Sequence, residues 1–393
     1  MKICSLFSGI GGIETGFLKV FPNAEIVFSS EIDVKTAKAY ELWFGHKPHG
    51  DITQINEKLI PDHDILVGGF PCQAFSVAGK RLGFEDTRGT LFFDVARIIK
   101  EKKPKLFVLE NVKGLLSHDS GKTFTTIISI LSDLDYLVDF EIMNSKYFDV
   151  PQNRERIVII GVQKELKDVK KEDWLLTSTN KKINEIKKNL QINNTFNFPF
   201  PKQQKISKTL LDVLEEDVDA KYTLPIKYTE DLIAKINEDI NQNNLLTDCK
   251  VIQMERHHWN DLDRQRRIYS TNGIGPTLLA RQDSPKIIMV GKLNMKAGEQ
   301  IKSVYSENGL SPTIDTAQGG HRQVKILIKQ KNYFFIRKMT PLEALRVQGF
   351  SDKFYNKLRE HKYSDTHIYK MAGNAVTVNV FEAIAKQIKY SLE

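Results

Sequence analysis

The first 162 residues alternate short apolar runs with amphipathic stretches, and this alternation restricts the fold more than any other feature of the chain. Runs such as KICSLF, AEIVFSSE and DILVGGF have the length and composition of strands. The intervening stretches GIETGFLKVF and DVKTAKAYELWF have helical periodicity. Strands that alternate with helices predict a doubly wound α/β sheet, because parallel neighbours need a crossover connection.

The same rhythm continues to the end of this region. TLFFDVARIIKEKK predicts a helix, KLFVLEN a buried strand and TFTTIISILSDL another helix. The last two runs, YLVDFEIMN and RIVIIGV, are separated by a short connection and predict two strands that pair antiparallel. The beginning of the final strand should then lie at the edge of the sheet where the parallel strands end.

The remainder of the chain has a different character. Residues 164–205 are rich in Lys and Asn, and they indicate a long surface insertion or linker, or a solvated helix over KKINEIKKNL. An internal repeat follows, IYSTNGIGPT at 268–277 and VYSENGLSPT at 304–313, and each copy predicts a strand, a tight turn and a second strand. This region therefore indicates a smaller, β-rich second domain. TPLEALRVQGF and AVTVNVFEAIAKQIKYSL close the chain with helical patterns.

Composition narrows the class of protein. With 393 residues and 41% hydrophobic content, the chain can bury a large core and a second, smaller one. Its net charge of +8 suits a polyanionic partner such as nucleic acid, although Lys-rich surfaces also serve solubility. MKICSLFSGIGG is too short and too Gly-rich for a secretory signal or a membrane span, so we expect a cytoplasmic location. Three cysteines without metal-ligand spacing predict a thiol, and neither a disulfide framework nor a metal site.

A glycine cluster follows the first predicted strand and opens a helix. Gly9, Gly11 and Gly12 would let the backbone approach a ligand at the helix N-terminus, although such clusters also form ordinary turns. Glu31 stands 20 residues after Gly11, at the end of the next strand, where an acidic side chain can accept hydrogen bonds from ribose hydroxyls. The third glycine of the dinucleotide fingerprint is missing, so the pattern favours a nucleoside cofactor over a pyrophosphate.

Two reactive groups follow neighbouring strands. Cys72 comes after DILVGG within GGFPCQAFSVAGK, and Glu110 ends KLFVLEN, so both fall at the carboxyl edge of the sheet, where ligands of open α/β sheets bind. A buried inert cysteine and a helix-capping carboxylate are the structural alternatives. Arg154 and Arg156 alternate just before the last strand and should point to one side, unless they are merely solvated. We expect a thiol, a carboxylate and two guanidinium groups on one rim.

These motifs, in this order, resemble those of bacterial cytosine-C5 DNA methyltransferases of the restriction-modification type. FSGIGG, GDITQI, GFPCQAFSVAGK, RGTLFFDVARII, ENVKGL and PQNRERIVIIG cover residues 3–162 almost without a gap, and TPLEALRVQGF and MAGNAVTVNV follow at about 337–380. The resemblance implies a Rossmann-like S-adenosylmethionine-dependent domain with a smaller, β-rich target-recognition domain. We expect residues 1–225, completed by 360–393, to form the catalytic domain and residues 226–359 the recognition domain.

The resemblance also implies residue roles. Cys72 would add to C6 of a flipped cytosine, Glu110 would engage N3 and the exocyclic amine, and Arg154 and Arg156 would hold the base oxygen, the phosphate or Glu110. Phe7 would stack near the adenine, Glu31 would bind the ribose and Asp51 the adenine amine. The implied cofactor-binding set is Phe7, Gly9, Gly11, Gly12, Glu31, Ile32, Asp51, Ile52, Pro71, Leu91, Asn374 and Val376. Ala375 stands after Asn374 where the family often has Ser.

Contacts with double-stranded DNA are expected from both parts of the chain. Gln73, Ser76 and Arg81 follow the nucleophile in the catalytic part. Arg281 and Arg322, each after one repeat, suit bidentate reading of guanine, or else lie in solvated loops. Gln265 or Gln300, each before a repeat, could fill the space that the flipped base leaves. We expect a monomer, and the resemblance would allow a cognate restriction endonuclease that acts on the same site.

Three other interpretations compete with a DNA methyltransferase. An RNA methyltransferase of the same family would share the reactive residues, but such enzymes resemble one another in a Cys-Phe-Thr element that this sequence lacks. A non-catalytic nucleic-acid binder is disfavoured because Cys72, Glu110, Arg154 and Arg156 are all present. A dehydrogenase with the same type of sheet is disfavoured by the glycine pattern and by the Pro-Cys pair. Base-resolution mapping of 5-methylcytosine would test activity and target together.

Overall fold

A computed structural model describes residues 1–71, 91–166, 171–203, 205–241, 252–253, 267–268, 289–293, 302–314, 316, 323–330 and 333–392. Its main feature is a six-stranded sheet with the strand order β2-β1-β3-β4-β6-β5. The first four strands in this order are parallel, and β6 runs antiparallel to both of its neighbours. The strands are β1 (Lys2–Leu6), β2 (Glu25–Ser29), β3 (Ile65–Gly69), β4 (Leu106–Val112), β5 (Tyr136–Asn144) and β6 (Glu155–Gln163). The predicted α/β class and the antiparallel final pair are confirmed.

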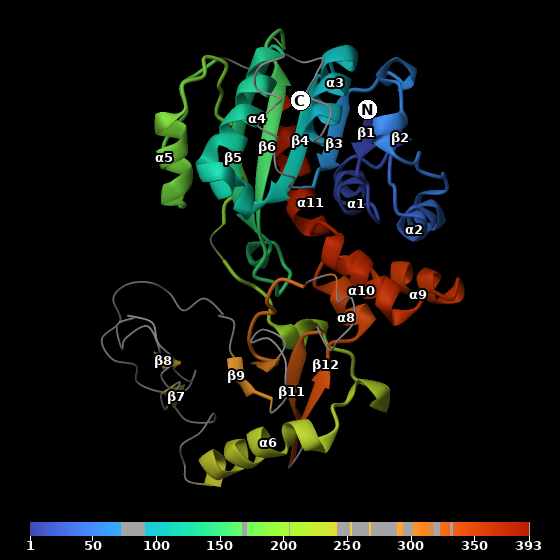
Figure 1. Ribbon diagram of the computed structural model, residues 1–393, viewed down its shortest axis with the longest axis vertical. Coiled ribbons are helices and arrows are strands. Elements are labelled where there is room, and N and C mark those ends of the chain that lie inside the picture. The colour runs from blue at the N-terminus through green and yellow to red at the C-terminus, as the bar shows by residue number, and fades with distance from the viewer. Residues whose placement is uncertain are drawn as a thin grey trace.

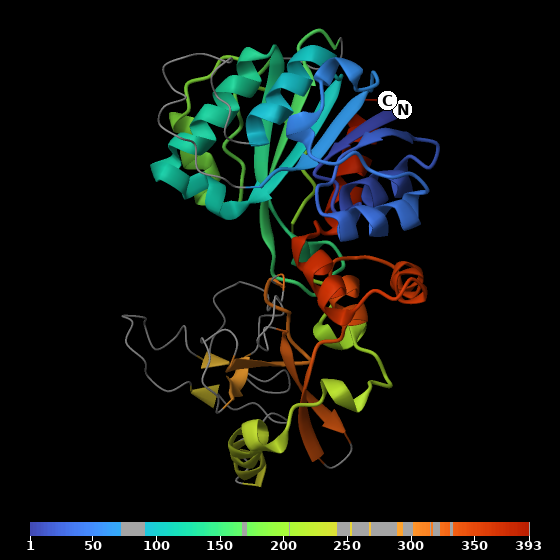
Figure 2. The same ribbon diagram turned by 45° about the vertical axis from the view of Figure 1, so that its right-hand side comes forward.

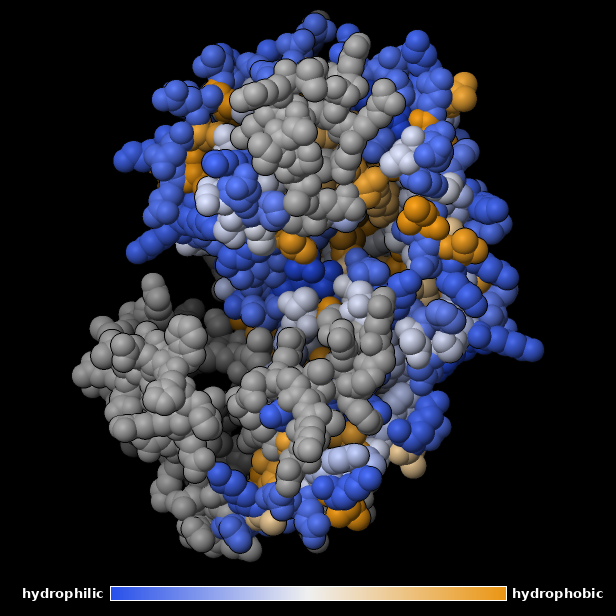
Figure 3. Space-filling model, in the orientation of Figure 1, coloured by the Kyte–Doolittle hydropathy of each residue, from blue (hydrophilic) through white to orange (hydrophobic). Residues whose placement is uncertain are grey.

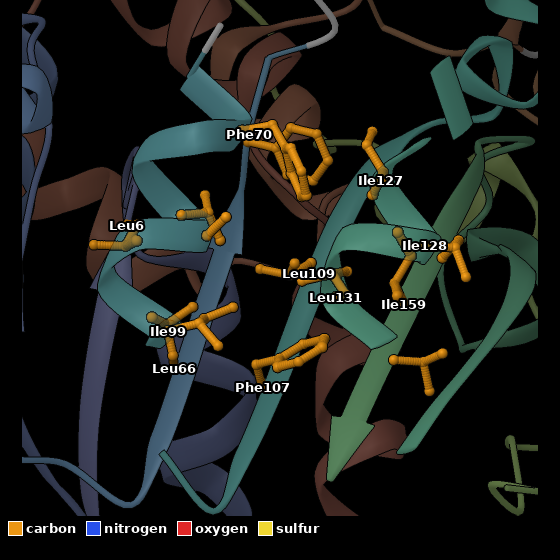
Figure 4. Packing of buried hydrophobic residues seen from close by; sticks show 14 of the residues in the cluster. Leu6, Leu66, Phe70, Ile99, Phe107, Leu109, Ile127, Ile128, Leu131 and Ile159 are labelled. Atoms are coloured by element: carbon orange, nitrogen blue, oxygen red, sulfur yellow. The ribbon is translucent and has the colours of Figure 1, made fainter. Parts of the chain in front are cut away.

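Helices cover both faces of this sheet, because its strands are apolar on both sides. In β4, Phe107 and Leu109 enter one core cluster, whereas Leu106 and Val108 enter another. The first cluster includes α3 and α4, and the second includes α1 and α11 (Figure 1). Figure 4 shows the first cluster, in which Phe107 and Leu109 face Ile128 and Leu131 of α4. These helices are α1 (Gly12–Val20), α3 (Leu91–Lys102), α4 (Lys122–Asp133) and α11 (Val378–Leu392).

The Lys- and Asn-rich stretch is ordered against the outer edge of the sheet over its described residues. It contains the helix α5 (Lys181–Asn189), which begins after the capping side chain of Asn180. Ile183 is buried, and Lys187 forms a buried ion pair of 2.6 Å with Asp139 of β5. Trp174 donates a hydrogen bond to the carbonyl oxygen of Val138. This stretch therefore covers the edge strand β5, which would otherwise offer unpaired backbone groups.

A second, smaller sheet lies below the first in both views (Figures 1 and 2). Its strand order is β12-β11-β10-β9, in which β10 and β11 are parallel and the other pairs antiparallel. The helix α6 (Ile226–Asn241) contributes Leu232 and Ile236 to a core shared with Val304 and Ile336. The strands are β9 (Met289–Lys292), β10 (Ser303–Ser306), β11 (Lys325–Gln330) and β12 (Tyr333–Lys338), and a separate pair consists of β7 (Ile252–Gln253) and β8 (Arg267–Ile268). The smaller β-rich part is confirmed.

A cluster of short helices joins the two sheets. The helices α8 (Pro341–Arg346), α9 (Asp352–Glu360) and α10 (Asp365–Asn374) share a core with α2 (Val34–Phe44). The sequence patterns indicated α2, α8 and α11, whereas α9 and α10 were not predicted. A capping serine precedes each of the two missed helices, Ser351 and Ser364.

A buried ion pair fixes the start of this helical cluster. Arg337, at the end of β12, makes hydrogen bonds of 2.8 and 2.6 Å to the two carboxylate oxygens of Glu343 in α8. Glu343 also accepts hydrogen bonds from the backbone amides of Thr340 and Glu215. The fully buried carboxylate of Glu343 thus accepts hydrogen bonds from three segments of the chain. These hydrogen bonds fix the geometry of the junction between the two sheets.

The described surface is mostly hydrophilic on the face shown in Figure 3, where apolar residues are exposed in small groups. Among the described residues, no helix combines the length and the apolar character that crossing a membrane requires.

Candidate active site

The glycine cluster forms the connection between β1 and α1, as predicted. Phe7, Gly9 and Gly11 have positive φ angles, and Gly11 is the N-cap of α1. A Cβ atom on Gly9 would meet no atom within 4 Å, so the backbone there faces open space. A Cβ on Gly11 would lie 2.0 Å from the ring of Phe44, and one on Gly12 would lie 2.7 Å from Val376. A side chain would therefore meet open space at Gly9, whereas the missing side chains of Gly11 and Gly12 allow close packing with Phe44 and Val376.

Two acidic residues lie beside this loop at the carboxyl edge of the sheet. Glu31 follows β2 and accepts hydrogen bonds from the backbone amides of Gly9 (3.0 Å) and Asp33 (2.8 Å). Burial raises the pKa of Glu31. The carboxylate of Asp51 accepts hydrogen bonds from the backbone amide and the hydroxyl of Thr53. The two acidic loops are adjacent because Glu31 donates its backbone amide hydrogen to His49, two residues before Asp51.

The isoleucines that follow these acids have different environments. Ile32 is 68% exposed next to the open space at Gly9, whereas Ile52 is buried in the core beneath the sheet edge. Leu91, the first residue of α3, packs partly against the same core.

The end of β3 is shaped by Gly69. A Cβ atom on Gly69 would lie 3.0 Å from a carboxylate oxygen of Glu110, so glycine leaves the space that this carboxylate occupies. The next residue, Phe70, accepts a hydrogen bond of 2.8 Å from the side chain of Asn111, which ties the ends of β3 and β4 together. Pro71 is exposed. Cys72, Gln73, Ser76 and Arg81 lie outside the described residues, and Cys72 is the residue directly after Pro71.

Glu110 and Arg156 form an ion pair at this edge. Glu110 is 7% exposed, and its carboxylate lies 3.0 Å from Nε of Arg156. The antiparallel register of β4 and β6 explains the contact, since Arg156 pairs with Val112 two residues beyond Glu110. Burial raises the pKa of Glu110, and the positive charges of Arg156 and Arg154 oppose that rise. The structure therefore brings Glu110 and both predicted arginines together.

Arg154 is the more deeply placed of the two arginines, at 3% exposure. Its Nη2 donates hydrogen bonds to the carbonyl oxygens of Gly373 (3.2 Å) and Ala375 (2.8 Å) at the end of α10. Its Nε and Nη1 have no partner. Arg154 therefore connects the edge of the sheet with the segment that leads into α11.

The segment between α10 and α11 closes the other side of the site. Asn374 is the last residue of α10 and is exposed. A methyl group of Val376 lies 2.7 Å from the position of a Cβ on Gly12, and another lies 3.8 Å from that on Gly69. Val376 thus packs between the glycine loop and the end of β3.

Some expected positions fall outside the part of the chain that the structure describes. These are Gln265, Arg281, Gln300 and Arg322 in the second half of the chain. The turn of the second repeat is described, and its carbonyl groups at Glu307 and Gly309 accept hydrogen bonds from the backbone amides of Leu211 and Leu210. Among the described residues, no group of three or more His, Cys, Asp or Glu side chains could hold a metal ion.

The sheet order, the glycine loop and the carboxylate at the carboxyl edge define a methyltransferase of the Rossmann-like α/β class. The model of the C-5 cytosine-specific DNA methylases matches residues 1–390. The chain belongs to this family, and it is a DNA cytosine-C5 methyltransferase.

Curated relatives agree over the whole chain. The Type II methyltransferase M1.ScrFI of Lactococcus lactis subsp. cremoris is 39% identical over 100% of this chain and 79% of its own length. The Type II methyltransferase M.SsoII of Shigella sonnei is 39% identical over 100% of this chain and 81% of its own. The Type II methyltransferase M.HhaI of Haemophilus parahaemolyticus is 34% identical over 100% of this chain and 95% of its own length. The resemblance to restriction-modification methyltransferases is therefore confirmed.

Solved structures with the same fold are more distant in sequence. A variant of DNMT2 from Spodoptera frugiperda has a TM-score of 0.61 at 17% identity and covers 99% of both chains. A putative DNA modification methyltransferase encoded within an Escherichia coli prophage has a TM-score of 0.58 at 19% identity, over 100% of this chain and 99% of its own. At these identities the likeness establishes the shared fold alone.

Proposed function

We propose that this enzyme methylates C5 of a cytosine within a short specific sequence of double-stranded DNA, with S-adenosylmethionine as the methyl donor and Cys72 as a covalent nucleophile. The observation that carries the proposal is the buried Glu110–Arg156 pair at the carboxyl edge of the sheet, next to the strand end that leads into Cys72. A buried carboxylate in contact with a guanidinium group at that edge suits recognition of a polar base.

The residues beside the glycine loop fit a nucleoside cofactor. Gly9 borders open space, and Ile32 exposes an apolar side chain next to it that an adenine ring could cover. Each carboxylate oxygen of Glu31 accepts one backbone hydrogen bond and keeps capacity for a ribose hydroxyl. Phe7, Asp51 and Val376 complete this side of the site. S-adenosylmethionine, when bound, supplies an electrophilic methyl group.

The chain's own residues carry the rest of the chemistry. Cys72 forms a bond from its thiolate sulfur to C6, and the displaced electron pair makes C5 nucleophilic. Burial raises the pKa of Glu110, which favours its role as the group that donates a proton to N3 as negative charge develops there, while Arg156 holds the carboxyl group in place. Once C5 carries the methyl group, water takes the C5 proton and the C5–H electron pair restores the double bond between C5 and C6. The sulfur then leaves C6 as a thiolate, and N3 returns its proton to Glu110.

The proposed recognition part is the second sheet with its flanking segments. The target cytosine must leave the duplex to reach Glu110, at a cost of about a few kcal/mol, and contacts from a second part of the protein must offset it. The net charge of +8 favours binding to the phosphate backbone. We keep residues 1–225 with 360–393 as the proposed catalytic domain and residues 226–359 as the proposed recognition domain.

Covalent trapping tests this function. DNA that contains 5-fluorocytosine cannot lose a proton from C5, so the wild type should become bound to it through Cys72. Cys72→Ala should bind the DNA without forming the adduct, and Cys249→Ala is the matched control that should still form it. An adduct with Cys72→Ala would refute the nucleophile. Trapping on fluorinated RNA and not on DNA would favour the RNA alternative, and base-resolution mapping of 5-methylcytosine would identify the target.

A further inference from the structure

Two fully buried glutamines in this protein have opposite hydrogen-bonding states. Gln348, at 0% exposure, donates from Nε2 to Ala372 (2.9 Å) and accepts from the hydroxyl of Thr377 (2.9 Å). Gln152, also at 0% exposure, has no partner for either Nε2 or Oε1. A buried amide without partners costs stability and would be replaced by an apolar side chain without loss. Its presence at a rim of charged groups therefore needs a functional explanation.

The backbone alone holds Gln152 in place. Gln152 forms a parallel bridge with Ser311 of the second repeat, where Ser311 donates its amide hydrogen to Pro151 (2.7 Å) and Asn153 donates its own to Ser311 (3.0 Å). The hydroxyl of Thr313 adds a hydrogen bond of 2.9 Å to the carbonyl oxygen of Asn153. The loop that carries Arg154 and leads into β6 is thus fastened to the second repeat without a hydrogen bond from the side chain of Gln152.

Arg154, two residues after Gln152, has unused hydrogen-bond donors that could pair with the acceptor of the Gln152 side chain. The backbone amide of Arg154 donates to the carbonyl oxygen of Gln152 (3.1 Å), and Nε and Nη1 of Arg154 are buried without partners. A guanidinium group has donors only, whereas the carboxamide of Gln152 offers an acceptor in Oε1. The unused donors and the unused acceptor therefore belong to neighbouring residues on the same loop. Arg154 in turn supplies part of the positive charge that acts on Glu110.

We propose that Gln152 is a positioning residue that acts through Arg154. When a cytosine occupies the space beside Glu110, Oε1 of Gln152 accepts a hydrogen bond from the free side of the Arg154 guanidinium group and holds its charge towards Glu110. Neither Oε1 of Gln152 nor Nε and Nη1 of Arg154 has another partner in the structure, so these atoms are available for this contact. This inference rests on the proposed function, since it assigns Gln152 a part in the same reaction.

Matched substitutions of the two glutamines separate this role from a structural one. In Gln348→Leu, the carbonyl oxygen of Ala372 and the hydroxyl of Thr377 lose their hydrogen-bond partner, so the denaturation midpoint should fall. In Gln152→Leu, two unsatisfied atoms are removed, so the midpoint should stay equal or rise. The value of kcat for Gln152→Leu should nevertheless fall at least about tenfold, while the Kd for DNA changes by no more than about twofold. Gln152→Met, which keeps an unbranched shape, repeats the test should the Leu variant fold poorly.

The pH profile gives a second readout, which a purely structural residue would not change. The charges that face Glu110 are those of Arg154 and Arg156, and both lower its pKa. If Gln152 no longer holds Arg154, the pKa of Glu110 should rise, and the limb of the kcat profile that Glu110 governs should move to higher pH. Unchanged kcat in both Gln152 variants, a loss of stability like that of Gln348→Leu, or an unshifted limb would overturn the proposal. Failure of the wild type to trap fluorinated DNA would instead overturn the proposed function, and this inference with it.

Discussion

Glu14 is a buried acidic residue beneath the glycine loop, and its ionisation should make the folding stability of the enzyme depend on pH. It is 1% exposed within α1 and accepts a hydrogen bond of 2.5 Å from the hydroxyl of Ser5 in β1. Burial raises its pKa to about 7, although this hydrogen bond acts in the opposite direction. The carboxyl group therefore gains a charge near neutral pH directly below the loop that borders the proposed cofactor site.

We predict that Glu14→Gln flattens the pH dependence of stability. An acid whose pKa is higher in the folded than in the unfolded state binds more protons when folded, so folding stability falls as pH rises from about 4.5 to about 7. The difference between wild type and variant should grow by roughly 2–3 kcal/mol over this window. Urea denaturation between pH 4.5 and 8 measures it. Glu25→Gln, at an exposed position, is the control, and parallel curves for wild type and Glu14→Gln would contradict the prediction.

The sequence predicted the cluster of charged residues at the sheet edge, but it did not predict the environments of Gln152, Gly11 and Gly12. Glu110, Arg154 and Arg156 were predicted to meet because strand alternation and sheet edges follow from local patterns. The place of Gln152 in the fold was not predictable, since its loop pairs with Ser311, which is 159 residues away along the chain. The sequence also could not reveal why glycine is needed at positions 11 and 12. Phe44 and Val376 occupy the space that a side chain at these positions would need. Long-range contacts decide these features, and sequence patterns carry no record of them.

Among the elements, α1 and α11 pack closely against each other at a glycine of α1. A Cβ atom on Gly16 of α1 would lie 2.7 Å from backbone atoms of Glu382 and of Val378, and 2.9 Å from one of Phe381. Phe17 of α1 and Phe381 of α11 share the core beneath the sheet. Because backbone atoms cannot move aside as a flexible side chain can, the two helices would have to separate to admit a methyl group.

We predict that Gly16→Ala destabilises the protein by about 1–3 kcal/mol, although alanine is the better helix former by about 1 kcal/mol. The free energy of unfolding in urea measures the effect. Gly50→Ala is the control: a Cβ there meets no atom within 4 Å, and the change should stay within about 0.5 kcal/mol. If Gly16→Ala were as stable as the wild type, α11 could shift away from α1 without loss of stability, and the prediction would be wrong.

The elements that the sequence did not predict share a physical cause. The helix α9 buries only Phe354 and Leu358, and the buried residues of α10 begin only at Ile368, so neither helix repeats an apolar pattern over its whole length. Their capping serines, Ser351 and Ser364, were the available signal. For α5, the sequence allowed a linker or a solvated helix, because its buried contact with the sheet involves a lysine, Lys187, paired with Asp139. A charge that becomes buried is not distinguishable from a solvated one in the sequence.

For the molecule as a whole, the second sheet and α6 form a unit with its own core. The unit begins where Leu224 donates its amide hydrogen to Ile336 (2.9 Å) and where Thr223 pairs with Arg337 of β12. Leu224, Leu232 and Ile336 belong to one hydrophobic cluster. A cut within β12 (Tyr333–Lys338) would divide that strand, whereas cuts before Thr223 and after Lys338 keep α6 and β12 with their partners.

We predict that exchanging residues 223–338 for the matching unit of a relative with another target transfers sequence choice. The hybrid should methylate the donor's site, because the catalytic edge remains in the recipient and base reading moves with the unit. Base-resolution mapping of 5-methylcytosine in cells that express the hybrid measures the outcome. A second hybrid with residues 250–335 exchanged should be less stable, since α6 and the end of β12 would face a foreign core. An active 223–338 hybrid that keeps the original site would place recognition elsewhere.

The position of α11 has a consequence for synthesis of the protein. This helix follows the second unit in the chain, yet it covers the face of the first sheet to which α1 also belongs (Figure 1). The ribosome therefore releases the residues that close this core only after it has made all of the second unit. A nascent chain that ends before Val376 holds the glycine loop and Cys72 but lacks α11, and it also lacks the side chain that packs between that loop and the end of β3. Translation order therefore places completion of this core after synthesis of the part that we propose chooses the DNA sequence.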